Sequence, residues 1–271
     1  MRKVLVILGG IIIIAALVFF IFVPAFQGKL VIDPIIHLGP LSIRWYGLIL
    51  AASILTGYFI IRKNSWKFGI SAKDIDDFAF WLVIVAVVGA RIYFVLFNWA
   101  YFSQNLAEIY KIWYGGISIY GSLIAGVIFS YFYTRKAAYS FWQLTDLLAL
   151  GLPLSQAIGR LGNFVNQEAY GTHTNLPWKM YVAAKQDYVH PTFLYEAVAN
   201  VLVFVVLKKM IGKFKPGVLV LTYFMAYSVI RFVVEGLRTD SLYISIFRVD
   251  QIVAVIILLI SGLLLWMRSK H

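Results

Sequence analysis

The chain of 271 residues contains no cysteine and only four histidines, His37, His173, His190 and His271. Without cysteine the protein has no disulfide, no thiolate metal site and no cysteine nucleophile of its own. The histidines occur in no metal-binding spacing such as His-Glu-x-x-His, and no Walker or Rossmann glycine pattern is present. We therefore expect neither a metal site nor a cofactor.

Charged residues are scarce as well. They make up 13% of the chain, whereas about a quarter is usual in soluble domains. Hydrophobic residues account for 62%, and the mean hydropathy is +0.84. Short segments of alternating apolar and polar residues, which a membrane β-barrel would show, are absent. This composition indicates an integral membrane protein made of helices.

Apolar segments long enough to span a bilayer, which takes about 17–25 residues in a helix, occur along the whole chain. They are Val4–Val23, Ile43–Ile61, Ile75–Phe97, Ile117–Tyr133, Phe141–Ile158, Phe193–Met210, Val218–Glu235 and Ile252–Met267. The predicted fold class is an all-α polytopic membrane protein with about eight transmembrane helices. The first run is longer than the roughly 7–15 apolar residues of a signal peptide, so we expect it to be retained.

Lysine predicts the orientation of these helices. The positive-inside rule assigns short loops rich in Lys and Arg to the cytoplasm. Threading eight spans from a cytoplasmic N-terminus places 10 of the 14 lysines on that side. Both termini are therefore predicted to be cytoplasmic.

Arginine is distributed differently, with 6 of 10 residues in outer loops or at the outer ends of helices. These six are Arg44, Arg91, Arg160, Arg231, Arg238 and Arg248. A guanidinium binds phosphate or carboxylate through two parallel hydrogen bonds, so this distribution indicates a site for an anionic head group. Snorkelling to the membrane interface is the alternative, above all for Arg44 and Arg248. A bilayer divides the basic charge between two faces, which argues against a nucleic-acid partner.

One polar stretch, "GRLGNFVNQEAYG" at Gly159–Gly171, interrupts the apolar runs. Arg160 and Asn163 share a helical face at the outer end of the fifth predicted helix, and the residues from Gln167 onward enter an external loop. Other polar residues are predicted at the same depth: Tyr46, Arg91, Ser118 and Tyr120. A plain interfacial loop does not need so many hydrogen-bonding groups, so the stretch is a candidate site.

The seventh predicted helix carries a second polar group, in which Arg231, Glu235 and Arg238 form one stripe. Ionisable groups within a span are costly unless they are paired or face a cavity, and they are therefore functional candidates. Arg231 and Glu235 can alternatively form a structural ion pair that locks helices together. We interpret Glu196 and Asp146, near helix ends, as structural.

The stretch Gly159–Gly171 resembles the signature of the bacterial prolipoprotein diacylglyceryl transferases, and the likeness continues from about Ile32 onward. Further matches are "IRWYGL" at Ile43–Leu48, "GGISIYGSLIAG" at Gly115–Gly126, "HPTFLYE" at His190–Glu196 and "RFVVEGLRTD" at Arg231–Asp240. The resemblance implies a seven-helix membrane domain over residues 31–271. The first predicted helix precedes this domain and nothing in its residues suggests chemistry, so we expect residues 1–30 to be an N-terminal transmembrane anchor. Residues 164–190 would form an extracytoplasmic loop with a small head.

The resemblance also implies an activity. It is transfer of the diacylglyceryl group of phosphatidylglycerol to the lipobox cysteine of a prolipoprotein, with formation of a thioether and release of glycerol phosphate. The enzyme would lie in the bacterial inner membrane with its site toward the outer leaflet. Because the substrate supplies the thiol, an enzyme without cysteine is chemically sufficient.

By position, the resemblance assigns Arg160 to the phosphatidylglycerol head group. Asn163, Glu168 and Gly171 complete that pocket. Arg231 and Glu235 are the second catalytic pair, Tyr46 is the functional tyrosine, and Arg238 is a candidate contact for the leaving group or the peptide.

Tyr120 departs from the family pattern, because family members often carry histidine there. A phenol is a poor base at neutral pH, since its reference pKa is about 10. We therefore expect Tyr120 to orient substrate or a neighbouring polar group. Thiol activation would come mainly from the arginine field, with Glu168 or Glu235 as possible proton acceptors.

Two rival functions come from other classes. A lipid or anion transporter could use the same arginine-lined cavity, but transporters usually show internal repeats and the two halves of this chain show none. A scaffold that holds lipid without reaction would not need Glu and Arg clustered in one stripe.

Overall fold

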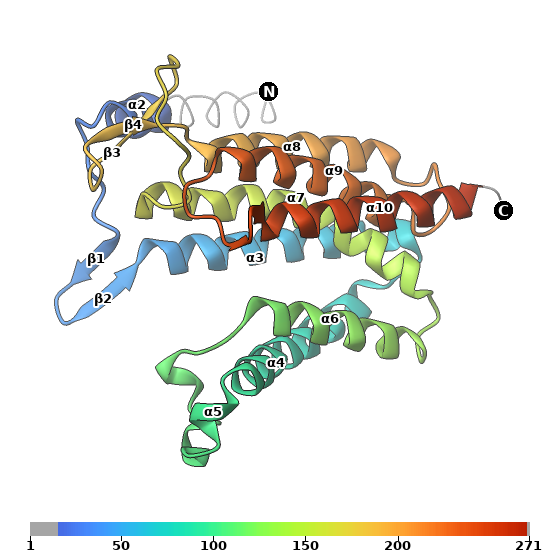
Figure 1. Cartoon of the computed structure of the whole chain (residues 1–271). Coiled ribbons are helices and arrows are strands. Elements are labelled where there is room, and N and C mark those ends of the chain that lie inside the picture. Colours follow the sequence, from blue (N-terminus) through green and yellow to red (C-terminus); the bar gives the residue numbers. More distant parts are fainter. Residues whose placement is uncertain (1–15, 270–271) are drawn as a thin grey trace. The chain divides into compact units, whose positions relative to one another are not determined.

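The structure is a computed structural model that describes residues 16–269. Figure 1 shows that helices dominate it. The long helices are α3 (Trp45–Asn64), α4 (Ala72–Phe97), α6 (Ile119–Thr134), α7 (Phe141–Asn166), α8 (Thr192–Met210), α9 (Val218–Leu237) and α10 (Val249–Ser269). Shorter helical segments are η1 (Val18–Phe22), α2 (Val23–Phe26), η2 (Ser65–Phe68), α5 (Trp99–Phe102), η3 (Leu106–Glu108) and η4 (Ile112–Tyr114).

Strands occur only as short antiparallel hairpins in the part of the chain that the structure describes. They pair β1 (Ile35–Leu38) with β2 (Leu41–Arg44), β3 (Met180–Val182) with β4 (Asp187–Val189), and β5 (Tyr243–Ile244) with β6 (Phe247–Arg248). The Gly39-Pro40 turn closes the first hairpin, with Gly39 at φ +60°. Strand β2 includes Ile43, so the second helix begins at Trp45 rather than at the predicted Ile43.

The predicted spans from the second to the eighth each correspond to one long helix. Residues 4–15 of the first predicted span lie outside the described residues, and its remainder is helical as far as Phe26. Four described helical stretches are long and apolar enough to cross a membrane: α3 with η2, α4, α9 and α10. Helix α6 is apolar but shorter. The chain is therefore a mainly helical membrane protein.

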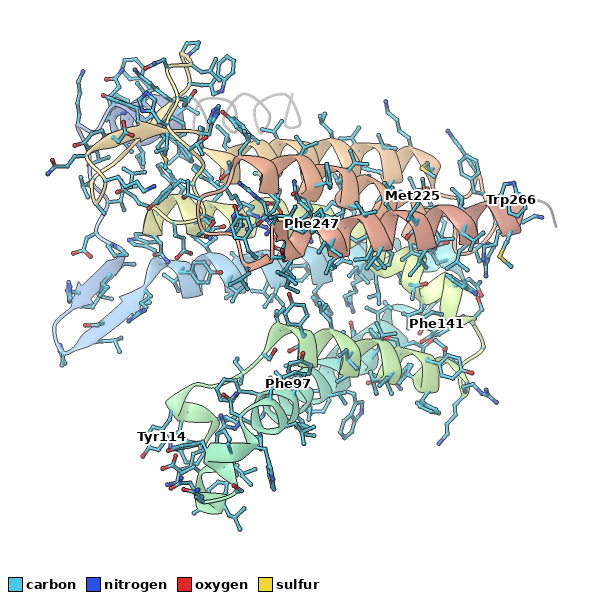
Figure 2. The ribbon with its side chains drawn as sticks, viewed as in Figure 1. Phe97, Tyr114, Phe141, Met225, Phe247 and Trp266 are labelled. Carbon is cyan, nitrogen blue, oxygen red and sulfur yellow. The ribbon has the colours of Figure 1, made fainter. Side chains whose placement is uncertain are left out.

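Large apolar side chains cover much of the helix surface. Figure 2 labels Phe97 and Tyr114, whose exposed fractions are 73% and 76%. Trp266, also labelled, is 56% exposed. Apolar surface of this extent is typical of a protein whose solvent is lipid.

The chain divides into two compact units. Unit 1 comprises the described residues up to Thr56, residues 152–207 and those from Leu221 onward; unit 2 comprises residues 57–151 and 208–220. In unit 2, α4 and α6 pack closely through Gly89 and Gly121. A Cβ on Gly89 would lie 2.9 Å from the Gly121 carbonyl oxygen, so a larger residue would separate the helices.

Two charged residues of unit 2 have structural roles. Asp146 is 2% exposed and accepts hydrogen bonds from the backbone N–H groups of Gly217 and Val220, at 2.6 and 2.8 Å. It therefore satisfies orphan donors at the start of α9, as its structural interpretation expected. Arg91 donates hydrogen bonds to four backbone carbonyls, those of Glu108, Ile109, Gly115 and Gly116. It fixes the loop after α4 rather than presenting a free guanidinium.

In unit 1, polar contacts join the C-terminal part of α7 to α8, and α9 to α10. Beside them the β3–β4 hairpin covers an apolar core. The buried residues of that core are Ala25, Phe164, Met180, Val182, Val189 and Phe193. The end of α7 and the start of α8 are thus fixed against the hairpin.

Candidate active site

An ion pair between α7 and α8 lies at the centre of the candidate site. Arg160 is paired through Nη2 with Glu196 Oε1 and donates from Nη1 to Asn163 Oδ1 at 3.2 Å. The Arg160 side chain is 22% exposed and that of Glu196 only 2%. Helix α7 continues past the predicted end at Ile158 as far as Asn166, so Arg160 and Asn163 are one helical turn apart on the same face.

Arg231 on α9 extends this ion pair into a cluster. Its Nη2 lies 2.7 Å from Glu235 Oε2, one helical turn away, and also contacts Asp250 at the start of α10. Its Nη1 lies 3.7 Å from Glu196 Oε2. Tyr227 donates a 3.3 Å hydrogen bond to Glu196 Oε1. The predicted pair of Arg231 and Glu235 is therefore in contact, and Glu196 joins it to Arg160.

A strained turn follows α7 and holds Glu168. Gln167 and Ala169 both have left-handed backbones, with φ of 49° and 54°. Asn163 Nδ2 donates to Glu168 Oε1 at 2.8 Å, and the Thr192 hydroxyl donates to the Ala169 carbonyl. Non-glycine residues adopt such a backbone only where the surroundings impose it, and strain of this kind concentrates at functional sites.

Gly171 lies where three segments meet. Its N–H donates to the His190 carbonyl at 2.9 Å, and it forms a β-bridge with Arg238. A Cβ at Gly171 would lie 2.8 Å from His190 Cβ and 2.9 Å from the Leu237 carbonyl oxygen. Only glycine fits here without a shift of backbone.

Arg238 is already paired. Its Nε and Nη2 donate to the two carboxylate oxygens of Asp240, at 2.9 and 2.6 Å. These hydrogen bonds hold the pKa of Asp240 below its usual range. Helix α9 ends at Leu237, so Arg238 lies just past the helix that was predicted to carry it. It remains near the other two residues of the predicted stripe, with Nε 3.9 Å from Glu235 Oε2.

The two predicted tyrosines belong to different units. The Tyr46 ring packs on the backbone of α7, because a Cβ on Gly162 would lie 2.7 Å from Tyr46 Cδ2. Tyr46 is therefore next to the turn of α7 that carries Arg160 and Asn163. Tyr120 is in the first turn of α6 in unit 2, half exposed, with its ring 6.3 Å from that of Tyr93.

The charges of the cluster are largely compensated. The guanidinium groups of Arg160 and Arg231 contact three carboxylates, those of Glu196, Glu235 and Asp250. The positive field of Arg160 and Arg231 that the sequence predicted is therefore neutralised by these carboxylates, and a bound anion must compete with them. Glu168 is exposed and has no ion pair among the described residues.

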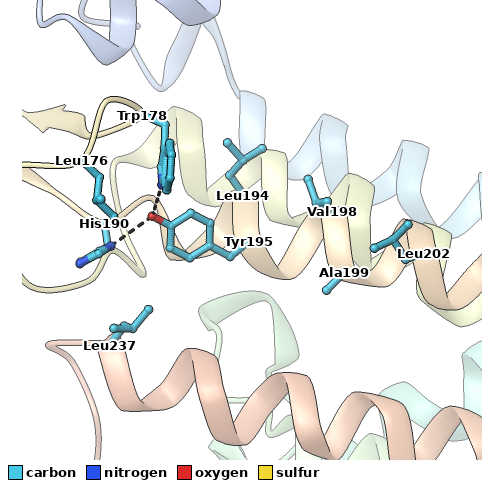
Figure 3. A pocket seen from close by; sticks show the side chains of 9 residues that line it. All are labelled: Leu176, Trp178, His190, Leu194, Tyr195, Val198, Ala199, Leu202 and Leu237. Atoms are coloured by element: carbon cyan, nitrogen blue, oxygen red, sulfur yellow. Dashed lines mark hydrogen bonds between the residues drawn. The ribbon is translucent and has the colours of Figure 1, made fainter. Parts of the chain in front are cut away.

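Two apolar grooves follow α8. The larger, about 630 Å³, is lined along α8 by residues from Leu194 to Leu202, and the other, about 350 Å³, lies between α7 and α8. Val198 and Leu202 line both. Figure 3 shows the polar end of the larger groove, where the Tyr195 hydroxyl accepts from Trp178 Nε1 at 2.8 Å and lies 3.1 Å from His190 Nδ1.

Two residues of the cluster are not among the sequence-predicted site residues. Glu196 was interpreted as structural, whereas it lies in the second turn of α8 at the centre of the cluster. Asp250 precedes the last apolar run, and no motif or spacing in the sequence marked it as a site residue. For Glu196 the signal was its position in "HPTFLYE", one of the family-like motifs.

Comparisons with known proteins match one family along most of the chain. A family model described as prolipoprotein diacylglyceryl transferase matches residues 33–267. The chain is 40% identical over 271 aligned residues, covering 95% of this chain and 93% of the relative, to the phosphatidylglycerol–prolipoprotein diacylglyceryl transferase of Fervidobacterium nodosum. It is 44% identical to the protein of that name from Acaryochloris marina, over 82% of this chain and 85% of the relative. The Finegoldia magna protein of that name is 42% identical, over 85% of this chain and 92% of the relative.

Proposed function

Because the chain belongs to the prolipoprotein diacylglyceryl transferase family, we propose that its arginine–carboxylate cluster binds the phosphatidylglycerol head group and stabilises the departing glycerol phosphate. The enzyme transfers the diacylglyceryl group of phosphatidylglycerol to a prolipoprotein, the first step of lipoprotein maturation. The observation that carries the proposal is the Arg160–Glu196–Arg231 arrangement, in which the buried Glu196 carboxylate lies beside two partly exposed guanidinium groups.

The reaction is a substitution at carbon. The sulfur of the lipobox cysteine bonds to the glyceryl carbon, the bond from that carbon to the phosphate oxygen breaks, and glycerol phosphate leaves with the electron pair. Negative charge therefore grows on the phosphate oxygen in the transition state. Cationic donors that are already oriented stabilise this charge without reorganisation. We assign this role to Arg160 and Arg231, with Arg238 nearer the peptide or leaving group.

The thiol proton needs an acceptor, and a carboxylate is the better candidate now that the arginine charge is compensated. A cysteine thiol has a reference pKa of about 8.5, so modest assistance suffices at neutral pH. Glu196 and Glu235 are paired with guanidinium groups. Among the described residues of the site, Glu168 is hydrogen-bonded only to the Asn163 amide and forms no ion pair. We assign proton acceptance to Glu168, with Glu235 as the alternative.

The acyl chains of the donor lie along α8 in this proposal. Arg160 precedes Leu161 in the chain and Glu196 precedes Ala197, and both of these neighbours line the smaller groove. A head group at the ion pair therefore places an acyl chain at the outer end of that groove. No charged residue lines either groove, as hydrocarbon requires.

We further propose that the protein lies in the bacterial inner membrane, with about eight spans, cytoplasmic termini, the β3–β4 hairpin outside and the site toward the outer leaflet. The lysine distribution supports this orientation. The partners are phosphatidylglycerol and lipobox peptides, and no nucleic acid is expected. The transporter alternative is not favoured, because the relatives are named as transferases.

Phosphatidylglycerol binding tests the proposed site directly. Purified wild type, Arg160→Gln and Arg231→Gln would be compared for binding of labelled phosphatidylglycerol in phosphatidylcholine vesicles, with Arg44→Gln on exposed β2 as the matched control. Transfer would be followed by the mass gain of a lipobox peptide. We expect weakened binding and slower transfer for the two cluster variants alone. Normal binding by folded Arg160→Gln and Arg231→Gln would contradict the head-group assignment.

A further inference from the structure

The N-terminal segment that precedes the family match packs directly against the frame of the site. The family model begins at residue 33, whereas η1 and α2 cover Val18–Phe26. Within them the Phe22 ring stacks on the ring of Phe164, with centroids 4.6 Å apart and planes 10° apart. Ala25 is 4% exposed in the same core. This segment is therefore part of a packed core, beyond the anchoring role expected from its sequence.

Four phenylalanine rings form one contact network. Phe26 contacts a ring from each of the two helices of the site, with its centroid 5.9 Å from that of Phe164 on α7 and 6.4 Å from that of Phe193 on α8. Phe164 and Phe193 are themselves 5.6 Å apart. Both are buried, at 5% and 1% exposure. We call Phe22 and Phe26 the phenylalanine wedge.

The wedge holds residues adjacent to the ion pair. Phe164 follows Asn163, which accepts a hydrogen bond from Arg160. Phe193 lies three residues before Glu196, so the two are neighbours on successive turns of α8. The wedge therefore fixes the spacing between the part of α7 that carries Arg160 and the part of α8 that carries Glu196.

A second connection ties the same segment to the strained turn. The carbonyl of Gln27 accepts a hydrogen bond from Tyr188 on β4, at 3.4 Å. Gln167 Oε1 in turn accepts from the N–H of Ala183, which follows β3, at 3.0 Å. The hairpin thus links the end of α2 to the turn that presents Glu168.

We propose that the phenylalanine wedge is a positioning element for the head-group site, acting through Phe164 and Phe193 on the Arg160–Glu196 pair. This inference rests on the proposed function, because it takes Arg160 as the head-group ligand. Packed interiors transmit small shifts, and a misplacement of about 1 Å in a site can lower the rate about a hundredfold. Loss of the wedge is expected to act first on phosphatidylglycerol binding.

The segment contains its own controls. Phe19 and Phe20 are 68% and 71% exposed, and their rings contact each other edge to face. Phe19→Ala and Phe20→Ala remove the same number of atoms as Phe22→Ala and Phe26→Ala without touching the core. Phe22→Tyr keeps a ring in the stacked position.

The experiment measures KM for phosphatidylglycerol, KM for a lipobox peptide and kcat in full-length protein, with the folded fraction from size-exclusion chromatography. For Phe22→Ala and Phe26→Ala we expect KM for phosphatidylglycerol to rise about tenfold with an unchanged peptide KM, while the controls and Phe22→Tyr stay within about twofold of wild type. If the wedge only stabilises the fold, apparent kcat will fall in proportion to the folded fraction and both KM values will stay unchanged. That result would overturn the proposal.

Arg160→Lys, assayed in parallel, tests the head-group assignment separately from the positioning role of the wedge. If it raises KM for phosphatidylglycerol and the wedge variants do not, the positioning role is wrong and the head-group assignment stands. If neither change affects this KM, both fail.

Discussion

Replacing Arg160 with lysine keeps the positive charge and removes the guanidinium fork. In the structure this side chain makes two directed contacts at once, from Nη1 to Asn163 Oδ1 at 3.2 Å and from Nη2 to Glu196. A single ammonium at the end of a flexible stem cannot reproduce that geometry, and it cannot bind a phosphate through two parallel hydrogen bonds. We therefore expect Arg160→Lys to lose most of its activity although its charge is unchanged.

The magnitude follows from the contacts that are lost. Hydrogen bonds to charged groups contribute about 1.5–3 kcal/mol each. The loss of one such hydrogen bond to the head group lowers kcat/KM for phosphatidylglycerol roughly ten- to hundredfold, at about 1.36 kcal/mol per factor of ten. The 22% exposure of the Arg160 side chain favours the lower half of this range.

The assay is transfer from phosphatidylglycerol to a synthetic lipobox peptide, read as product per minute by mass spectrometry. Arg62→Lys is the matched control, because Arg62 also forms two hydrogen bonds to a carboxylate, that of Asp76, but is 45% exposed. We expect the control to retain wild-type activity. Wild-type turnover by Arg160→Lys would show that the guanidinium geometry is not needed and would refute the head-group assignment.

Three further predictions use different parts of the chain. Gly171→Ala should abolish most activity because its Cβ meets backbone, whereas Gly47→Ala, with no atom within 4 Å of its Cβ, should be tolerated; equal activities of the two would contradict the steric argument. Tyr120→Phe should keep activity within roughly a hundredfold of wild type, a loss comparable to one hydrogen bond, and a folded variant that binds lipid without turnover would make this tyrosine the proton-transfer group. In this cysteine-free chain, a cysteine at His173 should react with an impermeant maleimide added outside cells and one at Lys213 should not; reversed labelling would exclude the orientation.

Helix positions were predictable from the length of the apolar runs, but helix ends at the site were not. The predicted fifth span ends at Ile158 because polar residues follow, yet α7 continues to Asn166. Arg160 is paired with Glu196 on α8 and Asn163 with Glu168 in the turn after α7, so the helix need not end where the apolar run ends. Hydropathy reports the average solvent around a helix and cannot anticipate a polar partner from another helix.

The difference between contacts within a helix and contacts between helices also explains which site residues could be predicted from the sequence. Arg231 and Glu235 are one helical turn apart, so their pairing follows from sequence spacing alone. Asp250 reaches Arg231 only because α9 and α10 pack together, and Glu196 reaches Arg160 from 36 residues away. Local periodicity predicts contacts within a helix, whereas contacts between helices depend on tertiary packing.

The variant Glu196→Gln tests whether the central carboxylate competes with the phosphate of the lipid for the two guanidinium groups. Two guanidinium groups share three carboxylates, so an incoming phosphate meets a cluster without excess positive charge. Glutamine retains the shape and an oxygen acceptor for Arg160 but removes one negative charge beside the head group. Over about 6 Å at an effective dielectric constant of about 20, that repulsion is about 3 kcal/mol before screening, and even a third of it is about a fivefold change in affinity.

We therefore expect Glu196→Gln to lower the Kd for phosphatidylglycerol at least about threefold, measured with labelled lipid in phosphatidylcholine vesicles. Transfer should nevertheless slow, because the arginines lose the anion that orients them before the lipid arrives. Asp76→Asn, which neutralises a carboxylate paired with Arg62 in unit 2, is the control for a general charge effect and should leave the Kd unchanged. Weaker binding by folded Glu196→Gln would mean that the carboxylate is a ligand of the head-group hydroxyls and not a competitor of the phosphate.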